Sequence, residues 1–271
     1  MSQRPGLPVP TDEDPVERLK KIVHLLRSPG GCPWDREQTH QSLIPNVIEE
    51  AYEVAEALRR GNPTEMEDEL GDLLLQVVMH AEMARDDSAA FDLESIAACV
   101  SDKLIRRHPH VFGDQVVDNT DGVLRQWDEI KRQEKGQLEA PYLKGVGEGL
   151  PALMAAGKLQ KKAAKVGFDW PEVSGVIAKV NEELAEVEEV MQEGQPPERL
   201  KEELGDLLFS VVNLVRSAGH ESESLLAAAN AKFASRFHFI EQQLKDRGQT
   251  LAGASLDEME ALWQQSKTAD L

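Results

Sequence analysis

Two short acidic patterns, each present twice, are the residues whose types and spacing best suit chemistry. The pattern Glu-Glu-x-x-Glu occurs at 49–53 and again at 182–186. The pattern Glu-x-x-Asp follows sixteen or seventeen residues later, at 69–72 and at 203–206. On a helix, residues three apart point in directions only about 60° apart. Each pattern therefore places its carboxylates on one helical face.

These acids interrupt apolar stretches, because Asp206 stands between Leu204 and Leu207. A hairpin of the two helices would bring four carboxylates together, where they repel one another and lose hydration unless cations compensate them or they protonate. Oxygen ligands without Cys or His suit Mg²⁺, with Mn²⁺ as the alternative. The predicted metal ligands are Glu183, Glu186, Glu203 and Asp206 in the second half, and Glu50, Glu53, Glu69 and Asp72 in the first.

An isolated pattern of this kind is usually a solvated helix face. Here it needs two helices and occurs twice, which favours the metal site over that alternative.

Basic and aromatic residues could attract a phosphorylated ligand to such a site. Lys179 lies one turn before Glu183, while Asn46 holds the matching position in the first half. Lys232 and Arg236 are four apart and share a helical face, and both can bind phosphate. Trp263 offers a flat face to a nucleobase. The alternatives are that Lys232 and Arg236 are surface charges and that Trp263 belongs to the core.

Helices must position all of these residues, because apolar residues recur at helical spacing along most of the chain. Leu70, Leu74 and Val78 belong to one such stripe, which predicts a buried face, and Leu204 and Leu208 belong to its repeat. The expected fold is all-α. The spacing and the capping signals predict helices over 15–27, 44–60, 63–86, 92–107, 120–135, 152–165, 171–193, 197–218, 222–246 and 256–267.

The two halves of the chain resemble each other beyond the acids. Lys232, Arg236 and Trp263 recur in the same order as Lys103, Arg107 and Trp127. We expect a duplicated helical module with four-helix-bundle-type packing. The predicted domains are an N-terminal module (1–136), a Gly-containing linker (137–150) and a C-terminal module (151–271).

Other motifs indicate structure more than chemistry. His108 and His110 flank Pro109, which predicts a helix stop and a loop. The glycine pattern at 145–149 follows no strand, so it is not a dinucleotide loop. Cys32 is expected in a turn.

Composition excludes several function classes. With 30 Lys and Arg against 49 Asp and Glu, the 271-residue chain has a net charge of 30 − 49 = −19. Such a charge argues against binding nucleic acid or anionic membranes. Two cysteines exclude a disulfide framework. We expect no signal peptide and no membrane span, hence a cytoplasmic protein.

Several segments together resemble the two-module members of the MazG family of nucleotide pyrophosphohydrolases. Besides the acidic patterns, the similar segments are GCPWD (31–35), RRHPHVF (106–112), KVGFDW (165–170), ELGDLLF (203–209) and the WQQ that begins at Trp263. The resemblance extends from about residue 14 to 268 and implies an all-α homodimer. It also implies Mg²⁺-dependent hydrolysis of nucleoside triphosphates to monophosphate and pyrophosphate, with the second module as the main catalytic one.

By that resemblance, the four acids of the second half hold metal and Lys179, Lys232, Arg236 and Trp263 hold the nucleotide. We expect water to attack the α-phosphorus, with Glu182 or Glu186 taking its proton. Because an aromatic face tolerates every base, broad use of NTPs and dNTPs is expected.

Two alternatives remain open. One is a narrower enzyme that acts on dUTP or on damaged nucleotides. The other is a non-catalytic, nucleotide-binding regulatory dimer with an unknown protein partner.

Overall fold

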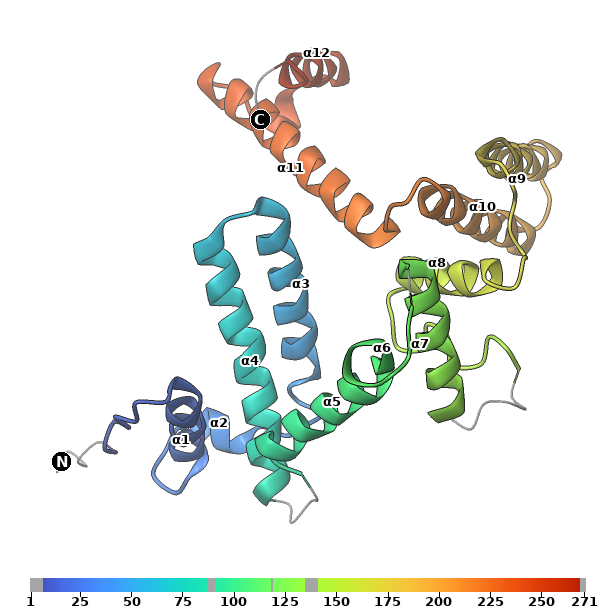
Figure 1. The fold of residues 1–271 in the computed structure, drawn as a ribbon. Helices are drawn as coiled ribbons and strands as arrows, with labels where there is room; N and C mark the ends of the chain where they lie inside the picture. The colour runs from blue at the N-terminus through green and yellow to red at the C-terminus, as the bar shows by residue number, and fades with distance from the viewer. Residues whose placement is uncertain (1–6, 87–90, 118, 135–140, 269–271) are drawn as a thin grey trace. The chain divides into compact units, whose positions relative to one another are not determined.

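The computed structural model of the chain describes residues 7–86, 91–117, 119–134 and 141–268 (Figure 1). Every regular element among these residues is a helix, which confirms the predicted all-α fold. The chain divides into two units, Met1–Leu138 and Glu139–Leu271. The predicted limits of the two modules and of the linker stay a prediction. Among the described helices, none has the length and apolar character that crossing a membrane requires.

The first unit is built around a pair of adjacent helices. Its elements are α1 (Pro15–Arg27), α2 (Pro33–Glu37), α3 (Ile44–Arg60), α4 (Pro63–Asp86), α5 (Leu93–Arg107), α6 (Pro109–Phe112) and α7 (Thr120–Glu134). Helices α3 and α4 pack against each other as a hairpin (Figure 1). Gly61 ends α3 with φ 70°, a left-handed conformation that glycine adopts without strain, so the chain reverses within two residues.

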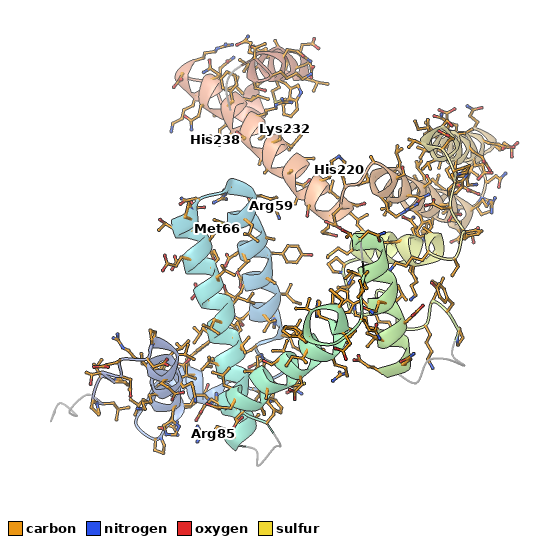
Figure 2. All side chains as sticks on the ribbon, in the orientation of Figure 1. Arg59, Met66, Arg85, His220, Lys232 and His238 are labelled. Atoms are coloured by element: carbon orange, nitrogen blue, oxygen red, sulfur yellow. The ribbon has the colours of Figure 1, made fainter. Side chains whose placement is uncertain are left out.

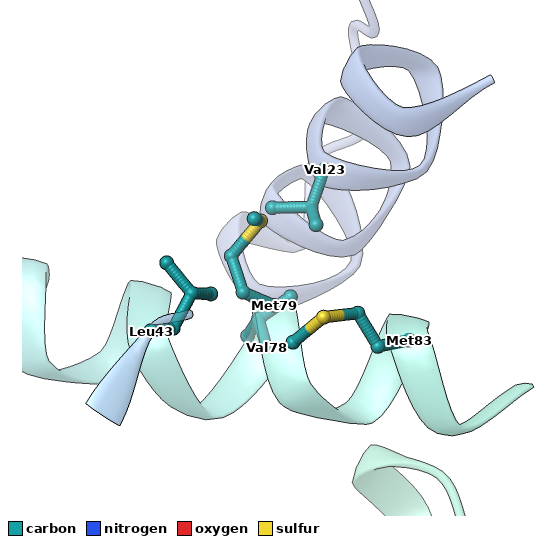
Figure 3. Packing of buried hydrophobic residues seen from close by; sticks show 5 residues of the cluster. All are labelled: Val23, Leu43, Val78, Met79 and Met83. Atoms are coloured by element: carbon teal, nitrogen blue, oxygen red, sulfur yellow. The ribbon is translucent and has the colours of Figure 1, made fainter. Parts of the chain in front are cut away.

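A small apolar core packs at the end of this hairpin that is opposite to the turn between α3 and α4. Figure 3 shows Val23 of α1 and Leu43 meeting Val78, Met79 and Met83 of α4. Leu43 immediately precedes α3, so the same core holds α1, the start of α3 and the second half of α4 together. The opposite half of the hairpin, where the acids lie, is left outside this core.

The second unit repeats the hairpin with different surroundings. Its elements are α8 (Ala152–Ala164), α9 (Val173–Glu193), α10 (Pro197–Ser217), α11 (Ser222–Asp246), the 3₁₀ turn η1 (Leu251–Gly253) and α12 (Leu256–Ser266). Helices α9 and α10 form the hairpin, and α8 packs on α10. Gly194, at φ 64°, ends α9 as Gly61 ends α3. A second core, made by Ile240, Leu244 and Leu262, joins α11 to α12.

The predicted helices agree with the observed ones to within two residues at each end. The predicted capping box at Ser255 and Glu258 is also present. The sequence did not predict α2, α6 or η1. The loop predicted around His108 is wrong in part: α5 ends at Arg107, but Pro109 then begins the one-turn α6, because proline suits the first position of a helix.

The apolar stripes of the two hairpins are only partly buried. Val78 is buried, but Leu74 remains 40% exposed, and Leu208 on the matching stripe is 61% exposed. The prediction of a buried face is therefore wrong for part of each stripe. Helix α4 packs on α3, α1 and α5, and α10 on α9, α8 and α11, yet Leu74 and Leu208 stay accessible.

Candidate metal centre

The hairpin of the second unit brings three predicted acids together. One carboxylate oxygen from each of Glu183, Glu186 and Glu203 lies within 4.8 Å of the others. Glu183 on α9 is 5% exposed and Glu203 on α10 is 2% exposed, so two carboxylates face each other inside the hairpin. Asp206 lies outside this group and is exposed, although it lines a cavity together with Glu183. We call Glu183, Glu186 and Glu203 the second-unit acidic group.

Two basic residues balance this group. The Lys179 ammonium lies 2.7 Å from Glu183 and 2.9 Å from Glu182, and its hydrogen bonds to these residues raise the pKa of Lys179. Arg199 forms an ion pair with Glu203. Lys179 was predicted from the sequence, whereas Arg199 was missed. The sequence could have predicted this ion pair, because Arg199 precedes Glu203 by four residues and so shares its helical face.

The second-unit acidic group nevertheless retains unbalanced negative charge. Burial raises the pKa of Glu186, and the neighbouring charges of Glu203 and Glu183 raise it further. Oε2 of Glu183 is buried without a hydrogen-bond partner in the described part of the chain. Buried carboxylate oxygens that lack donors and repel one another fit a hard divalent cation. The residues present are therefore suited to hold a metal ion.

The first unit has a matching but less balanced group. Oxygens of Glu50, Glu69 and Asp72 lie within 4.8 Å of one another, and these residues are half-buried or exposed. We call them the first-unit acidic group. Burial raises the pKa of Glu50, and Asp72 raises it further. Burial also raises the pKa of Glu69, as does the charge of Glu53, which lies outside the group.

Of the predicted phosphate and base residues, Lys179 lies at the second-unit acidic group, whereas Arg236 and Trp263 form a cluster of their own. Lys232 projects from α11 (Figure 2), and Arg236 lies one turn further along. The guanidinium carbon of Arg236 is 5.7 Å from the ring centre of Trp263 on α12, and Phe233 contacts the same ring. Among the described residues, no ion pair or hydrogen bond joins this cluster to the second-unit acidic group.

A cavity of about 280 Å³ lies beside the second-unit acidic group. Lys179, Glu183 and Asp206 reach it from α9 and α10. Most of its remaining wall is apolar, with Phe168 and Trp170 among the lining residues. No motif in the sequence predicts this cavity. The aromatic residues of the KVGFDW segment were the one feature of the sequence that could have indicated it. The rest of the wall comes from three helices that only the fold brings together.

The fold and the site define a class of protein. It is an all-α protein with two helical hairpins, and each hairpin brings together acidic residues that are suited to bind a metal ion. The sequence profile of the MazG nucleotide pyrophosphohydrolase domain matches residues 38–112 and 172–238, which include both hairpins. The chain belongs to the MazG family, whose members are in general metal-dependent.

Two bacterial relatives match over nearly their whole length. A protein of Escherichia coli (strain K12), named nucleoside triphosphate pyrophosphohydrolase, is 44% identical over 259 residues, which cover 94% of this chain and 98% of the relative. A Thermotoga maritima protein, named nucleoside triphosphate pyrophosphohydrolase/pyrophosphatase MazG, is 43% identical over 254 residues, 94% of this chain and 96% of the relative. The Bacillus subtilis protein YabN is 45% identical over 252 residues, 93% of this chain and 51% of the relative.

Proposed function

We propose that this chain is a nucleoside triphosphate pyrophosphohydrolase that hydrolyses NTPs and dNTPs to monophosphate and pyrophosphate, with Mg²⁺ as its metal. The observation that supports this most directly is the second-unit acidic group, which lies beside a cavity in a chain whose relatives bear the name of that activity. The C-terminal unit is proposed as the main catalytic one, because its acids are the more buried and have adjacent cations.

Glu183, Glu186 and Glu203 would hold Mg²⁺, with Asp206 as the fourth ligand and Mn²⁺ as a substitute ion. When bound, the ion supplies charge neutralisation at phosphate oxygens and lowers the pKa of water. Glu182, which is exposed beside the group, and Glu186 are the proposed acceptors of the proton that the attacking water loses.

Lys179 is placed to bind a phosphate oxygen, since it already lies at the edge of both the acids and the cavity. Lys232 and Arg236 are proposed to neutralise the pyrophosphate that leaves, and Trp263 to contact the nucleotide. The first-unit acids Glu50, Glu53, Glu69 and Asp72 are proposed as a second metal site.

A homodimer is also proposed. The exposed apolar residues on the hairpins support it, because Leu184 is 45% exposed and Leu208 is 61% exposed on the two helices that carry the second-unit acidic group. Pairing two hairpins would form a four-helix bundle and would cover these side chains. The cytoplasmic location stays a prediction.

Product analysis tests the proposed activity. The full chain is incubated with ATP and Mg²⁺, and the products are separated by ion exchange. AMP with pyrophosphate is the expected result, whereas ADP with phosphate would place the cleavage elsewhere and contradict the proposal. A substrate panel separates a broad enzyme from one confined to dUTP or to damaged nucleotides. Nucleotide binding without pyrophosphate release would indicate a regulatory binder.

A further inference from the structure

The cavity beside the second-unit acidic group has the size of a pocket for part of a nucleotide. At about 280 Å³ it lies just below the range of roughly 300–1,000 Å³ that is usual for small-molecule sites. A flat ring system would fit it, whereas a complete nucleoside triphosphate would not. Its wall is mostly apolar, which suits the uncharged end of such a ligand, and includes Lys179, Glu183 and Asp206 beside the acidic group together with the ion pair of Asp169 and Arg216.

Three aromatic residues contribute to the wall and remain accessible to a ligand, with Phe168 79% and Trp170 43% exposed. Phe168, Trp170 and Phe209 all contribute to the wall, and aromatic faces bind nucleobases of any identity by stacking. Phe168 and Trp170 belong to the short segment between α8 and α9, so this segment and the hairpin together enclose the space.

The position of Trp170 is fixed from two sides. The backbone N–H of Trp170 donates to Asp169, and the Asp169 carboxylate accepts from Arg216 of α10 at 2.6 Å. On the other side, a Cβ at Gly175 would lie only 2.5 Å from the Trp170 ring. Glycine at this position of α9 therefore gives the indole room to lie against the helix.

Besides Oε2 of Glu183, a second polar atom of a lining residue lacks a hydrogen-bond partner among the described residues. Gln160 of α8 lines the cavity and is 8% exposed, and its side-chain nitrogen donates to the carbonyl of Phe209 at 2.8 Å. Because that carbonyl can only accept, the bond fixes the orientation of the amide. The amide oxygen of Gln160 is then buried with no hydrogen-bond donor among the described residues. A ligand with an N–H group would supply the missing donor.

We propose that this cavity receives the nucleobase of the triphosphate, with Trp170 and Phe168 against its faces and the Gln160 oxygen accepting a hydrogen bond from a base N–H. The inference rests on the proposed function for the nature of the ligand. Every common nucleobase carries such a donor on its pairing edge, so the Gln160 contact holds the base without selecting one sharply. This assignment competes with base stacking by Trp263, which does not line the cavity.

Steady-state kinetics on two substrates test the pocket. ATP is compared with ribose 5-triphosphate, which lacks the base, both with Mg²⁺. Gln160→Met keeps the length of the side chain and removes the acceptor, so KM for ATP should rise about tenfold. KM for ribose 5-triphosphate should not change. Gly175→Ala, which displaces the Trp170 ring, should act in the same direction and more weakly.

Gln76→Met is the matched control, because Gln76 is also 8% exposed with an unpaired buried oxygen but lies on α4 of the first unit. It should leave both KM values unchanged. Equal increases on both substrates for Gln160→Met, or no increase on either, would overturn the pocket. An ATP-selective increase seen for Trp263→Ala and not for Gln160→Met would assign the base to Trp263 instead.

Binding measured without turnover separates a failure of the pocket from a failure of the proposed activity. AMP should quench tryptophan fluorescence in the wild-type chain. That quenching should be lost in Trp170→Phe and retained in Trp263→Phe, and the reverse pattern would overturn the pocket. Wild-type protein that binds AMP in this way but releases no pyrophosphate would refute the activity and leave the base pocket in place.

Discussion

The two units carry the same four acids at the same spacing within each helix, but the acids that converge differ, as do their neighbours. In the second-unit group, Glu183 follows Lys179 by four residues and Glu203 follows Arg199 by four, and both pairs are in contact. In the first unit, Asn46 stands four residues before Glu50, and Glu65 stands four before Glu69. A cation on the same helical face has thus been replaced once by a neutral residue and once by another acid.

Burial and nearby carboxylates raise the pKa of acids in both groups. In the first-unit group the pKa values of both Glu50 and Glu69 are raised, first by burial and then by nearby carboxylates, with Glu65 among the contributors at Glu69. The second-unit acids are more deeply buried, which alone would penalise their charge more. Burial and neighbouring carboxylates likewise raise the pKa of Glu186, while Glu183 and Glu203, the two most buried acids, are the ones that have a cation one helical turn away.

The largest expected effect is a loss of pyrophosphate release when an acid of the second unit, and not its equivalent in the first unit, is changed. Glu203→Gln should lower the rate of pyrophosphate release by at least about 100-fold, because it removes a proposed ligand and not merely a group that supports one. The matched change in the first unit, Glu69→Gln, should retain most of the activity. Release of pyrophosphate from ATP is measured, with circular dichroism to show that the helices persist. Equal losses in the two variants would mean that both units turn over substrate.

Exchanging the counter-ions should have a smaller effect. Lys179→Asn gives the second unit the residue found in the first and removes one charge-assisted hydrogen bond, worth roughly 1.5 kcal/mol, so kcat/KM should fall about tenfold. The reverse change, Asn46→Lys, should raise the melting temperature of the metal-free chain by placing a cation beside Glu50. Unchanged kinetics in Lys179→Asn would remove Lys179 from the nucleotide site.

Charge repulsion in the first-unit group can be measured by stability. Glu50→Gln removes one of three clustered negative charges, so without divalent ions the melting temperature should rise by about 1–3 °C. With Mg²⁺ this gain should disappear, because the wild-type group would then be neutralised. Glu67→Gln on α4 makes the same change of charge outside the group and should not depend on Mg²⁺. A Mg²⁺ dependence shared by both variants would contradict a metal site in the first unit.

The smallest expected effect compares the two equivalent arginines. Arg107 hydrogen-bonds to Glu134 and, together with Arg106, holds the pKa of Glu134 at about 2, against an ordinary value of 4.5. Because this pKa is depressed in the folded state, the contact contributes stability above about pH 4.5 and loses it as the pH falls towards 2.

Glu134→Gln should therefore lower the melting temperature slightly at neutral pH, and this difference from wild type should shrink as the pH falls from about 4.5 towards 2. Thermal unfolding followed across this range gives the difference from wild type. Arg236 contacts the ring of Trp263 instead of a carboxylate. The change in melting temperature caused by Arg236→Gln should therefore not depend on pH in this range. A constant difference between wild type and Glu134→Gln down to pH 2 would exclude the ion pair as the cause.

The sequence predicted the local structure well, for identifiable reasons. Helical periodicity, prolines at helix starts and the capping residues of α12 are all short-range signals, and they located each long helix. The repeated spacing of the acids also predicted that Glu183, Glu186 and Glu203 would converge, as they do. One-turn elements such as α6 were missed, because four residues carry no periodicity.

Contacts between distant segments were predicted less well. Asp206 was expected beside Glu183, Glu186 and Glu203, but it lies outside their group and is exposed, although it lines the same cavity as Glu183. Arg236 and Trp263 do meet, yet the structure does not bring them to the second-unit acidic group. Neither result follows from spacing along one helix.

By itself, the sequence determined which residues share a helical face, because a fixed rise and rotation per residue decide this from spacing alone. It thereby determined which acids share a face within each helix, and that Lys179 lies one turn before Glu183. Only the tertiary structure decided which carboxylates are buried and that Gln160, Trp170 and Glu183 border one cavity. Those properties depend on how α8, α9 and α10 pack, and packing between helices is set by side chains that are far apart in the chain.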